Sequence, residues 1–576
     1  MTSSRTTLKM YLLLFLTVVF IPSAAVFAQA SPAQKLVSAT PDAVLGFIAT
    51  SGGDNIEPAF DKTVTARLWR DPGVQGFIDA IEKGLLAKIT DGSDDPETAK
   101  IIDMVRSSIR LALTRPLAIG VAQKETQDGP PIYGFAMLDA GPRKAEIVSA
   151  LAKLEALADE GDIVDVQVGS LTMHGPKDPG GVPGYWGWNG DHFIFSFNDG
   201  SGLAMKNLKA GNAPALRQIQ KVPGAGDALV IHLNKDKIFN LLDMIAQMEG
   251  GEEEFGMVKT VIKELGLDKL KTITARMGFD GKDTVSSSLV EMPAPRTGLM
   301  TNFKTINLDM FDAVDAGAMG ASAFNCDVGG LYDTIMNAIK TVVGEDFAQV
   351  EQGIAMIEQQ LQIKIRDGLL KSLSGPMVAY SMPGGPATGS PQGAFALVAQ
   401  LEDAALWETS ITALGQFAAA ASEGMVQISS QEQGDKTMHT WTVLPLAMAQ
   451  IMPSWCVAGD KVVIASNPTF LKSGVDQLGS GSKSIRSTDG FKKATANLPD
   501  NLVSFRYNDA KVQFNQMMMG MQQFWPMATM YAQKAGFKLP VVLPNLTHIA
   551  EHMGPAYQYS WYDDQGIHSY SRAVGL

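Results

Sequence analysis

The sequence is poor in the residues from which disulfide scaffolds and nucleic-acid sites are built. It has 2 cysteines among 576 residues, and its 47 Lys and Arg are outnumbered by 60 Asp and Glu. Two cysteines cannot form the disulfide framework of a small secreted scaffold. The net charge of -13, without a basic cluster, argues against nucleic acid or an anionic membrane as partner, because both attract surfaces rich in Lys and Arg.

Sequence motifs of common enzyme classes are also missing. The chain has no G-x-S-x-G elbow, no Walker loop and no dinucleotide-binding fingerprint. No cofactor is therefore expected, and the sequence favours a binding role over a catalytic one.

A long apolar run occurs only at the N-terminus. Arg5 and Lys9 precede the run Met10–Ile21, and the small-x-small triplet Ala28–Ala30 follows it. This order predicts a cleaved signal peptide over 1–30, with retention as a membrane anchor as the alternative. We therefore expect an exported protein, periplasmic or extracellular, whose mature chain has no membrane span.

Two distant stretches share one design, Pro183–Leu208 and Pro453–Leu478. Each contains a strand pattern, a tight polar turn, a second strand pattern and a helical segment. The turns are Asn189-Gly190 and Gly459-Asp460. Both stretches therefore predict a β-hairpin that leads into a helix.

Further matches flank these hairpins. The string LTRP at 113–116 corresponds to LSGP at 373–376, and Met277-Gly278 corresponds to Met553-Gly554. The spacing between matches grows slowly along the chain, as expected for two copies that differ by small loop insertions.

The repeat predicts the fold class and its division. We expect an α+β protein of two tandem related domains, each mainly an antiparallel sheet with packed helices. The predicted domains are 31–295 and 296–576, joined at Pro293-Ala294-Pro295, where two prolines cannot continue a strand ladder. The sequence does not determine the oligomeric state.

A short string near the C-terminus resembles the zinc site of inverted metallopeptidases. His548, Glu551 and His552 form H-x-x-E-H, which on a helix would place both histidines on one face, with Glu551 as general base. No Glu follows Glu551 to supply a further ligand, and the first copy has Thr272 and Arg276 in place of the histidines. A zinc-dependent hydrolase is therefore an alternative to surface histidines on a short helix.

A methionine-rich segment offers a second candidate site. Met517 and Met521 recur at helical spacing with Phe514, Met518 and Phe524. Thioethers can bind Cu(I), but the first copy has mainly Ile and Leu in this place, which favours a core face or an adaptable apolar groove.

Aromatic residues crowd one arm of the first hairpin. Of Tyr185, Trp186 and Trp188, only the two tryptophans can share a strand face. The second copy is expected to carry Cys456 and Ala458 at their positions, which favours strand packing over a shared ring-binding platform.

Cys326 and Cys456 both lie in expected strands. Export permits a disulfide between them, and buried free thiols are the alternative. The sequence leaves this choice open.

Two motifs carry a family resemblance. The string IASNP at Ile464–Pro468 and the strings HMGP and DDQG within His548–Tyr570 resemble those of large exported bacterial proteins classed only as a domain of unknown function. The resemblance implies the two-copy α+β architecture over most of the mature chain, and no activity can be inferred from it. We therefore expect an exported, non-catalytic protein that binds a protein or an apolar ligand in the cell envelope, with the zinc hydrolase and a carrier with a Met-rich groove as alternatives.

Overall fold

The computed structural model describes residues 31–89, 96–124, 131–156, 162–168, 171–177, 184–198, 213–224, 227–249, 252–373, 375–391, 393–480, 483–534 and 539–576. The predicted signal peptide and the helix expected to end at Leu208 lie outside these residues.

The strands form one sheet of 20 strands, and each pairing between named strands of the described chain is antiparallel. The strands of the first half are β1 (Val44–Thr50), β2 (Leu117–Gln123), β3 (Ile132–Asp139), β4 (Ile163–Val168), β5 (Leu171–Pro176), β6 (Gly184–Asn189), β7 (His192–Phe197), β8 (Leu229–Asn234), β9 (Thr272–Asp280) and β10 (Asp283–Glu291). The strands of the second half are β11 (Gly320–Cys326), β12 (Gly375–Met382), β13 (Ala394–Gln400), β14 (Val426–Gln433), β15 (Lys436–Val443), β16 (Ser454–Ala458), β17 (Lys461–Ala465), β18 (Leu502–Asp509), β19 (Met553–Tyr562) and β20 (Gly566–Gly575).

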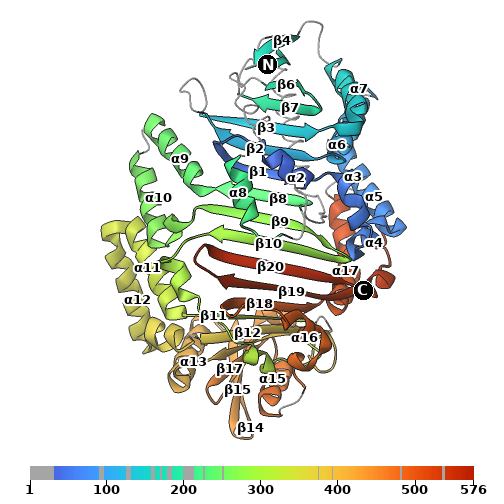
Figure 1. Cartoon of the computed structure of the whole chain (residues 1–576). Helices are drawn as coiled ribbons and strands as arrows, with labels where there is room; N and C mark the ends of the chain where they lie inside the picture. The colour runs from blue at the N-terminus through green and yellow to red at the C-terminus, as the bar shows by residue number, and fades with distance from the viewer. Residues whose placement is uncertain are drawn as a thin grey trace.

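The two halves meet where β10 pairs with β20 (Figure 1). Outward from this junction the first half runs β10, β9, β8, β1, β2, β3, β7, β6, β5, β4, and the second runs β20, β19, β18, β11, β12, β13, β17, β16, β15, β14. Each strand of the first half therefore has the same place, counted from the junction, as the strand ten numbers later in the second half. The α+β class with a large antiparallel sheet is confirmed, whereas the domain boundary at 295/296 stays a prediction.

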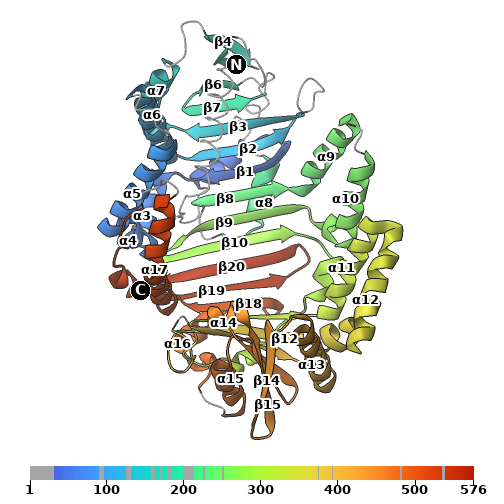
Figure 2. The ribbon, with the colours of Figure 1, turned by 180° about the vertical axis from the view of Figure 1, so that it is seen from behind.

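The helices gather mainly at the two ends of the strands (Figures 1 and 2). Those of the first half are α2 (Pro32–Val37), α3 (Gly53–Phe60), α4 (Val64–Arg70), α5 (Pro72–Ile89), α6 (Pro96–Leu113), α7 (Lys144–Glu155), α8 (Pro214–Gln220), α9 (Lys235–Glu249) and α10 (Glu252–Glu264). Those of the second half are α11 (Val328–Val343), α12 (Phe347–Leu361), α13 (Ala404–Ala421), α14 (Leu444–Met448), α15 (Pro468–Ser480), α16 (Asp489–Thr495), α17 (Ala510–Lys534) and α18 (Thr547–Ala550).

The antiparallel junction makes the two halves exchange helices. Because β10 and β20 run in opposite directions, equivalent connections leave the sheet at opposite ends. Helix α10 of the first half consequently packs against α11 of the second, and α17 of the second lies beside α4 and α5 of the first (Figure 2).

Each half buries an apolar core against the sheet. In the first half, Phe47 and Phe135 of the strands pack with Ile219 of α8. In the second half, Phe505 of β18 and Phe491 of α16 pack with their ring centroids 5.5 Å apart. Burial of such large side chains is the main favourable term that holds the helices to the sheet.

Local sequence explains the hairpins and the start of α15. Gly190 (φ 61°) and Gly459 (φ 68°) adopt the left-handed conformation that the predicted tight turns require. The Asn467 side chain accepts a hydrogen bond from the Phe470 amide (2.9 Å), which caps α15, and donates one to the Thr388 carbonyl (2.9 Å). Asn467 therefore ties the β12–β13 connection to the second hairpin.

Candidate functional site

The structure does not assemble the H-x-x-E-H string into a metal site. Helix α18 ends at Ala550, so Glu551 and His552 lie beyond it. His548 instead places its Nε2 atom 3.0 Å from the Asp71 Oδ2 atom. Among the described residues, no three His, Cys, Asp or Glu side chains form a group that could hold a metal ion. His548 and His552 therefore do not share one helix face.

The two cysteines are free thiols. Cys326 ends β11 and Cys456 lies in β16, with β12, β13 and β17 between them in the sheet. Neighbouring strands are about 4.8 Å apart, whereas the Cα atoms of a disulfide lie within about 7 Å. The strand order therefore excludes the Cys326–Cys456 bridge that the sequence left open. Burial raises the pKa of both thiols.

The methionine-rich segment is α17, and its methionines face in different directions. Met518 is 5% exposed and packs with Phe514, Val64 and Leu68, the last two from α4. Met517, about 100° from it around the helix, is 50% exposed. The interpretation as a core face therefore holds for one side of α17 only.

The outward side of α17 is apolar and has no charge. We call it the α17 face and define it by Met517, Met521, Phe524, Met527 and Tyr531, all exposed. No Asp, Glu, Lys, Arg or His occurs from 512 to 533. The corresponding helix of the first half, α9, carries five acidic or basic residues along its length. A surface helix normally turns its apolar side inward, so the α17 face is the reverse of the usual arrangement.

The strand register corrects the predicted match between the two hairpins. Trp186 lies opposite His174, and Trp455 lies opposite His439. The counterpart of Trp186 is therefore Trp455 and not Cys456, because the comparison of the sequences was displaced by one residue. A displacement of one residue exchanges the two faces of a strand. Sequence reasoning missed both histidines, although each precedes its tryptophan by a comparable distance in the chain.

In both halves the paired histidine and tryptophan rings stack. The centroids are 6.2 Å apart for His174 and Trp186, and 3.9 Å apart for His439 and Trp455. A glutamate of the preceding helix lies near each pair: Glu155 accepts a hydrogen bond from Trp186 Nε1 (2.6 Å), and Glu408 Oε1 lies 3.6 Å from His439 Nε2. Trp188 packs against Phe193, as expected for strand packing.

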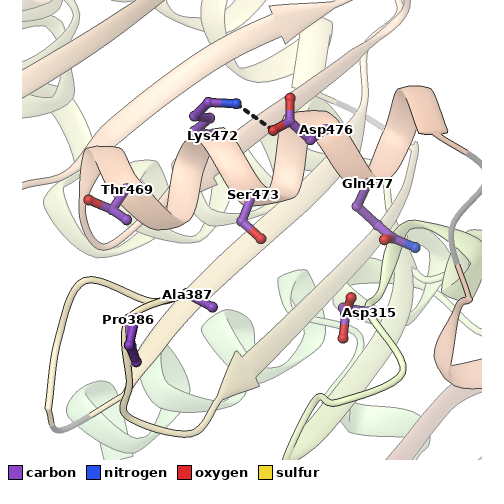
Figure 3. Close-up of a pocket in the computed structure, with 8 residues that line it drawn as sticks. All are labelled: Asp315, Pro386, Ala387, Thr469, Lys472, Ser473, Asp476 and Gln477. Atoms are coloured by element: carbon purple, nitrogen blue, oxygen red, sulfur yellow. Dashed lines mark hydrogen bonds and ion pairs between the residues drawn. The ribbon is translucent and has the colours of Figure 1, made fainter.

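A polar pocket of about 350 Å³ lies between α15 and the β12–β13 connection (Figure 3). Its one ammonium group, on Lys472, is 2.6 Å from the Asp476 carboxylate. A cation already paired within its own helix offers little to an anionic ligand. The lining residues are Asp315, Pro386, Ala387, Thr469, Lys472, Ser473, Asp476 and Gln477.

Comparison with protein-family models and with curated proteins gives no match. Among solved structures, crystal forms I and III of TP0453 align with 46% of this chain and with 78% and 79% of their own, at 11% and 8% identity. The TM-score is 0.21 in both cases, too low to show a common fold, so nothing is transferred from TP0453. Within the described ranges, no helix is both long and apolar enough to cross a membrane.

Proposed function

We propose that the protein is an exported binding protein of the bacterial cell envelope, and that the α17 face docks the apolar surface of a partner protein. The observation that carries the proposal is the uncharged row of exposed methionine and aromatic side chains along α17. Export is supported by the signal-peptide pattern over 1–30.

The chemistry of the face supports a protein partner. Methionine side chains are flexible and polarisable, and proteins use them at surfaces that must adapt to a partner. Met517, Met521, Phe524 and Tyr531 follow one another at the spacing of a single helix face, the pattern by which a helix presents anchors to a groove. An anionic lipid surface is disfavoured, because only Lys511 and Lys534 are basic on α17 and the chain is strongly acidic.

The alternatives have weaker support. A carrier would enclose its apolar ligand, yet no methionine of α17 lines the pocket of Figure 3 or a second pocket of about 300 Å³ beside Tyr507 and Leu576. A zinc hydrolase would need His548 and His552 on one metal ion, and His548 is paired with Asp71 instead.

Site-specific crosslinking tests the proposal. A photoreactive benzoylphenylalanine at Met521 should give an adduct with one defined protein in the cells that export this chain. The same probe at Met248 of α9, which is 69% exposed, is the matched control and should give none.

The captured protein must then bind in purified form. Met517→Asp/Met521→Asp should weaken its binding to the full mature chain at least about 10-fold, whereas Met248→Asp should leave it unchanged. Adducts with lipid only, or equal binding by all three proteins, would exclude a protein partner for the α17 face.

A further inference from the structure

Three side chains at the outer end of the sheet have the relative positions of a nucleophile, a base and an orienting acid. Ser430 of β14 places its Oγ atom 2.9 Å from His439 Nδ1 of β15. On the other side of the ring, His439 Nε2 lies 3.6 Å from the Glu408 Oε1 atom of α13. The ring is fixed by its stack on Trp455, at 16° between the planes. A hydroxyl within hydrogen-bond distance of an imidazole, with a carboxylate beyond it, is the arrangement that activates serine for nucleophilic attack.

The first half of the molecule has the corresponding histidine and tryptophan, but no serine beside the histidine. Asp165 of β4 lies opposite His174 of β5, at the position that Ser430 occupies opposite His439. The Asp165 carboxylate is 3.7 Å from His174 Nδ1, and it has no hydroxyl group that the imidazole could activate as a nucleophile. The histidine–tryptophan stack is therefore common to both halves, whereas the hydroxyl occurs only in the second.

The surroundings of His439 keep its imidazole neutral. Burial lowers the pKa of His439, and the opposing effect of Glu408 does not reverse this direction. The side chain of His439 is mostly buried, and none of the described residues forms a hydrogen bond to its Nε2 atom. The tautomer with a proton on Nε2 directs that proton toward Glu408 and leaves Nδ1 to accept the Ser430 proton.

Ser430 lies on an open edge. Strand β14 is the outermost strand of the second half, and no described strand pairs with its outer side (Figure 1). In the β14–β15 ladder the Leu444 amide donates a hydrogen bond to the Met425 carbonyl. Hydrogen-bonded pairs alternate along an antiparallel ladder, so the backbone amides and carbonyls of odd-numbered β14 residues face β15 and those of even-numbered residues face outward. The amide of Ser430 therefore points to the free edge, where it could stabilise an oxyanion that forms at the attacked carbonyl.

We propose that Ser430 is a nucleophile toward carboxylic esters, with His439 as its general base and Glu408 as the residue that positions and stabilises the imidazolium. This activity would be additional to the docking function and departs from the non-catalytic expectation. The Oγ–carbonyl bond forms while the proton moves to His439 Nδ1. The ester C–O bond then breaks, and the leaving alkoxide takes that proton. Water then attacks the acyl carbon while His439 takes its proton. The acyl–Oγ bond breaks, the carboxylic acid leaves, and Ser430 Oγ receives the proton from His439.

A fluorophosphonate probe on the full mature chain tests this assignment. Its phosphorus forms a bond to Oγ as fluoride leaves, and the serine proton passes through His439. We expect one adduct per chain, located at Ser430 by peptide mass spectrometry and absent in Ser430→Ala. His439→Gln should slow labelling about 100-fold, whereas His174→Gln, the matched change in the other half, should leave the rate unchanged. Equal labelling of wild type and Ser430→Ala, or of wild type and His439→Gln, would overturn the proposal.

A second measurement covers the case in which His439→Gln does not fold. Ser430→Cys and Ser429→Cys alter neighbouring residues that are both exposed and face opposite sides of the strand. A thiol beside His439 should react with iodoacetamide about 10-fold faster at neutral pH than the thiol at 429, because the imidazole promotes thiolate formation. Equal rates at the two positions would show that His439 does not act as a base.

Discussion

Ser286 of β10 and Ser571 of β20 share a hydrogen bond of 2.7 Å across the junction of the two halves. Next to them Ser287 lies opposite Tyr570, and each of the two is four residues past the first residue of its strand, Asp283 of β10 or Gly566 of β20. Equivalent strands of the two copies thus pair with each other, so the junction behaves as an interior part of one sheet.

Arg572 should be the main polar support of this junction. Its guanidinium donates to Asp283 (2.6 Å) and to Asp280 (2.7 Å), which belong to the other half. Arg572→Met leaves two carboxylates without their partner and should lower the free energy of unfolding by about 2 kcal/mol. Urea titration followed by circular dichroism measures this change. Arg506→Met, at an exposed position of β18, is the control and should change stability by less than about 0.5 kcal/mol.

Acid should destabilise the first half through His232. Burial lowers the pKa of this histidine, which is 1% exposed and hydrogen-bonded to Thr274, to about 4. The unfolded chain binds the proton at His232 near pH 6.5, whereas the folded chain binds it only near pH 4. The free energy of unfolding therefore has its full value above pH 6.5 and falls as the pH is lowered from 6.5 to about 4. The loss is on the order of 3 kcal/mol. The difference in stability between wild type and His232→Gln, measured from pH 7 to pH 4, should shrink accordingly; a constant difference would contradict the buried neutral state.

The two sides of α17 should respond differently to truncation. Met518→Ala removes a buried side chain and should cost about 3 kcal/mol, whereas Met517→Ala, at an exposed position, should cost less than about 1 kcal/mol. Chemical unfolding of the two variants side by side provides the test. Similar costs would mean that the α17 face is covered in the protein and not available for docking.

Cys326 and Cys456 should remain thiols after export. The intact mass of the mature protein should be the same with and without reductant, and a thiol reagent should modify both residues only after unfolding. The reason is that burial raises the pKa of both groups and restricts access, while the thiolate is the reactive form. A mass lower by two hydrogens in the absence of reductant would refute the strand order that separates the cysteines.

The candidate sites show what sequence patterns can supply. The helical spacing around Met517 and Met521 predicts α17 with a core face or an apolar groove. It does not say which side of the helix is buried, because the packing partner α4 comes from the other half of the chain. His439 and Ser430 escaped notice for a similar reason. They meet only through strand pairing, and an error of one residue in register hides the matching tryptophan.

The sequence by itself determined the local elements of this protein. Turns at Gly190 and Gly459 and the cap at Asn467 depend on the conformations and hydrogen bonds of neighbouring residues, which a short window of sequence contains. Only the tertiary structure decided the pairing of β10 with β20, the separation of the cysteines and the exposure of the α17 face. These features depend on contacts between segments far apart in the chain, whose pairing follows from the burial of whole faces and leaves no local pattern.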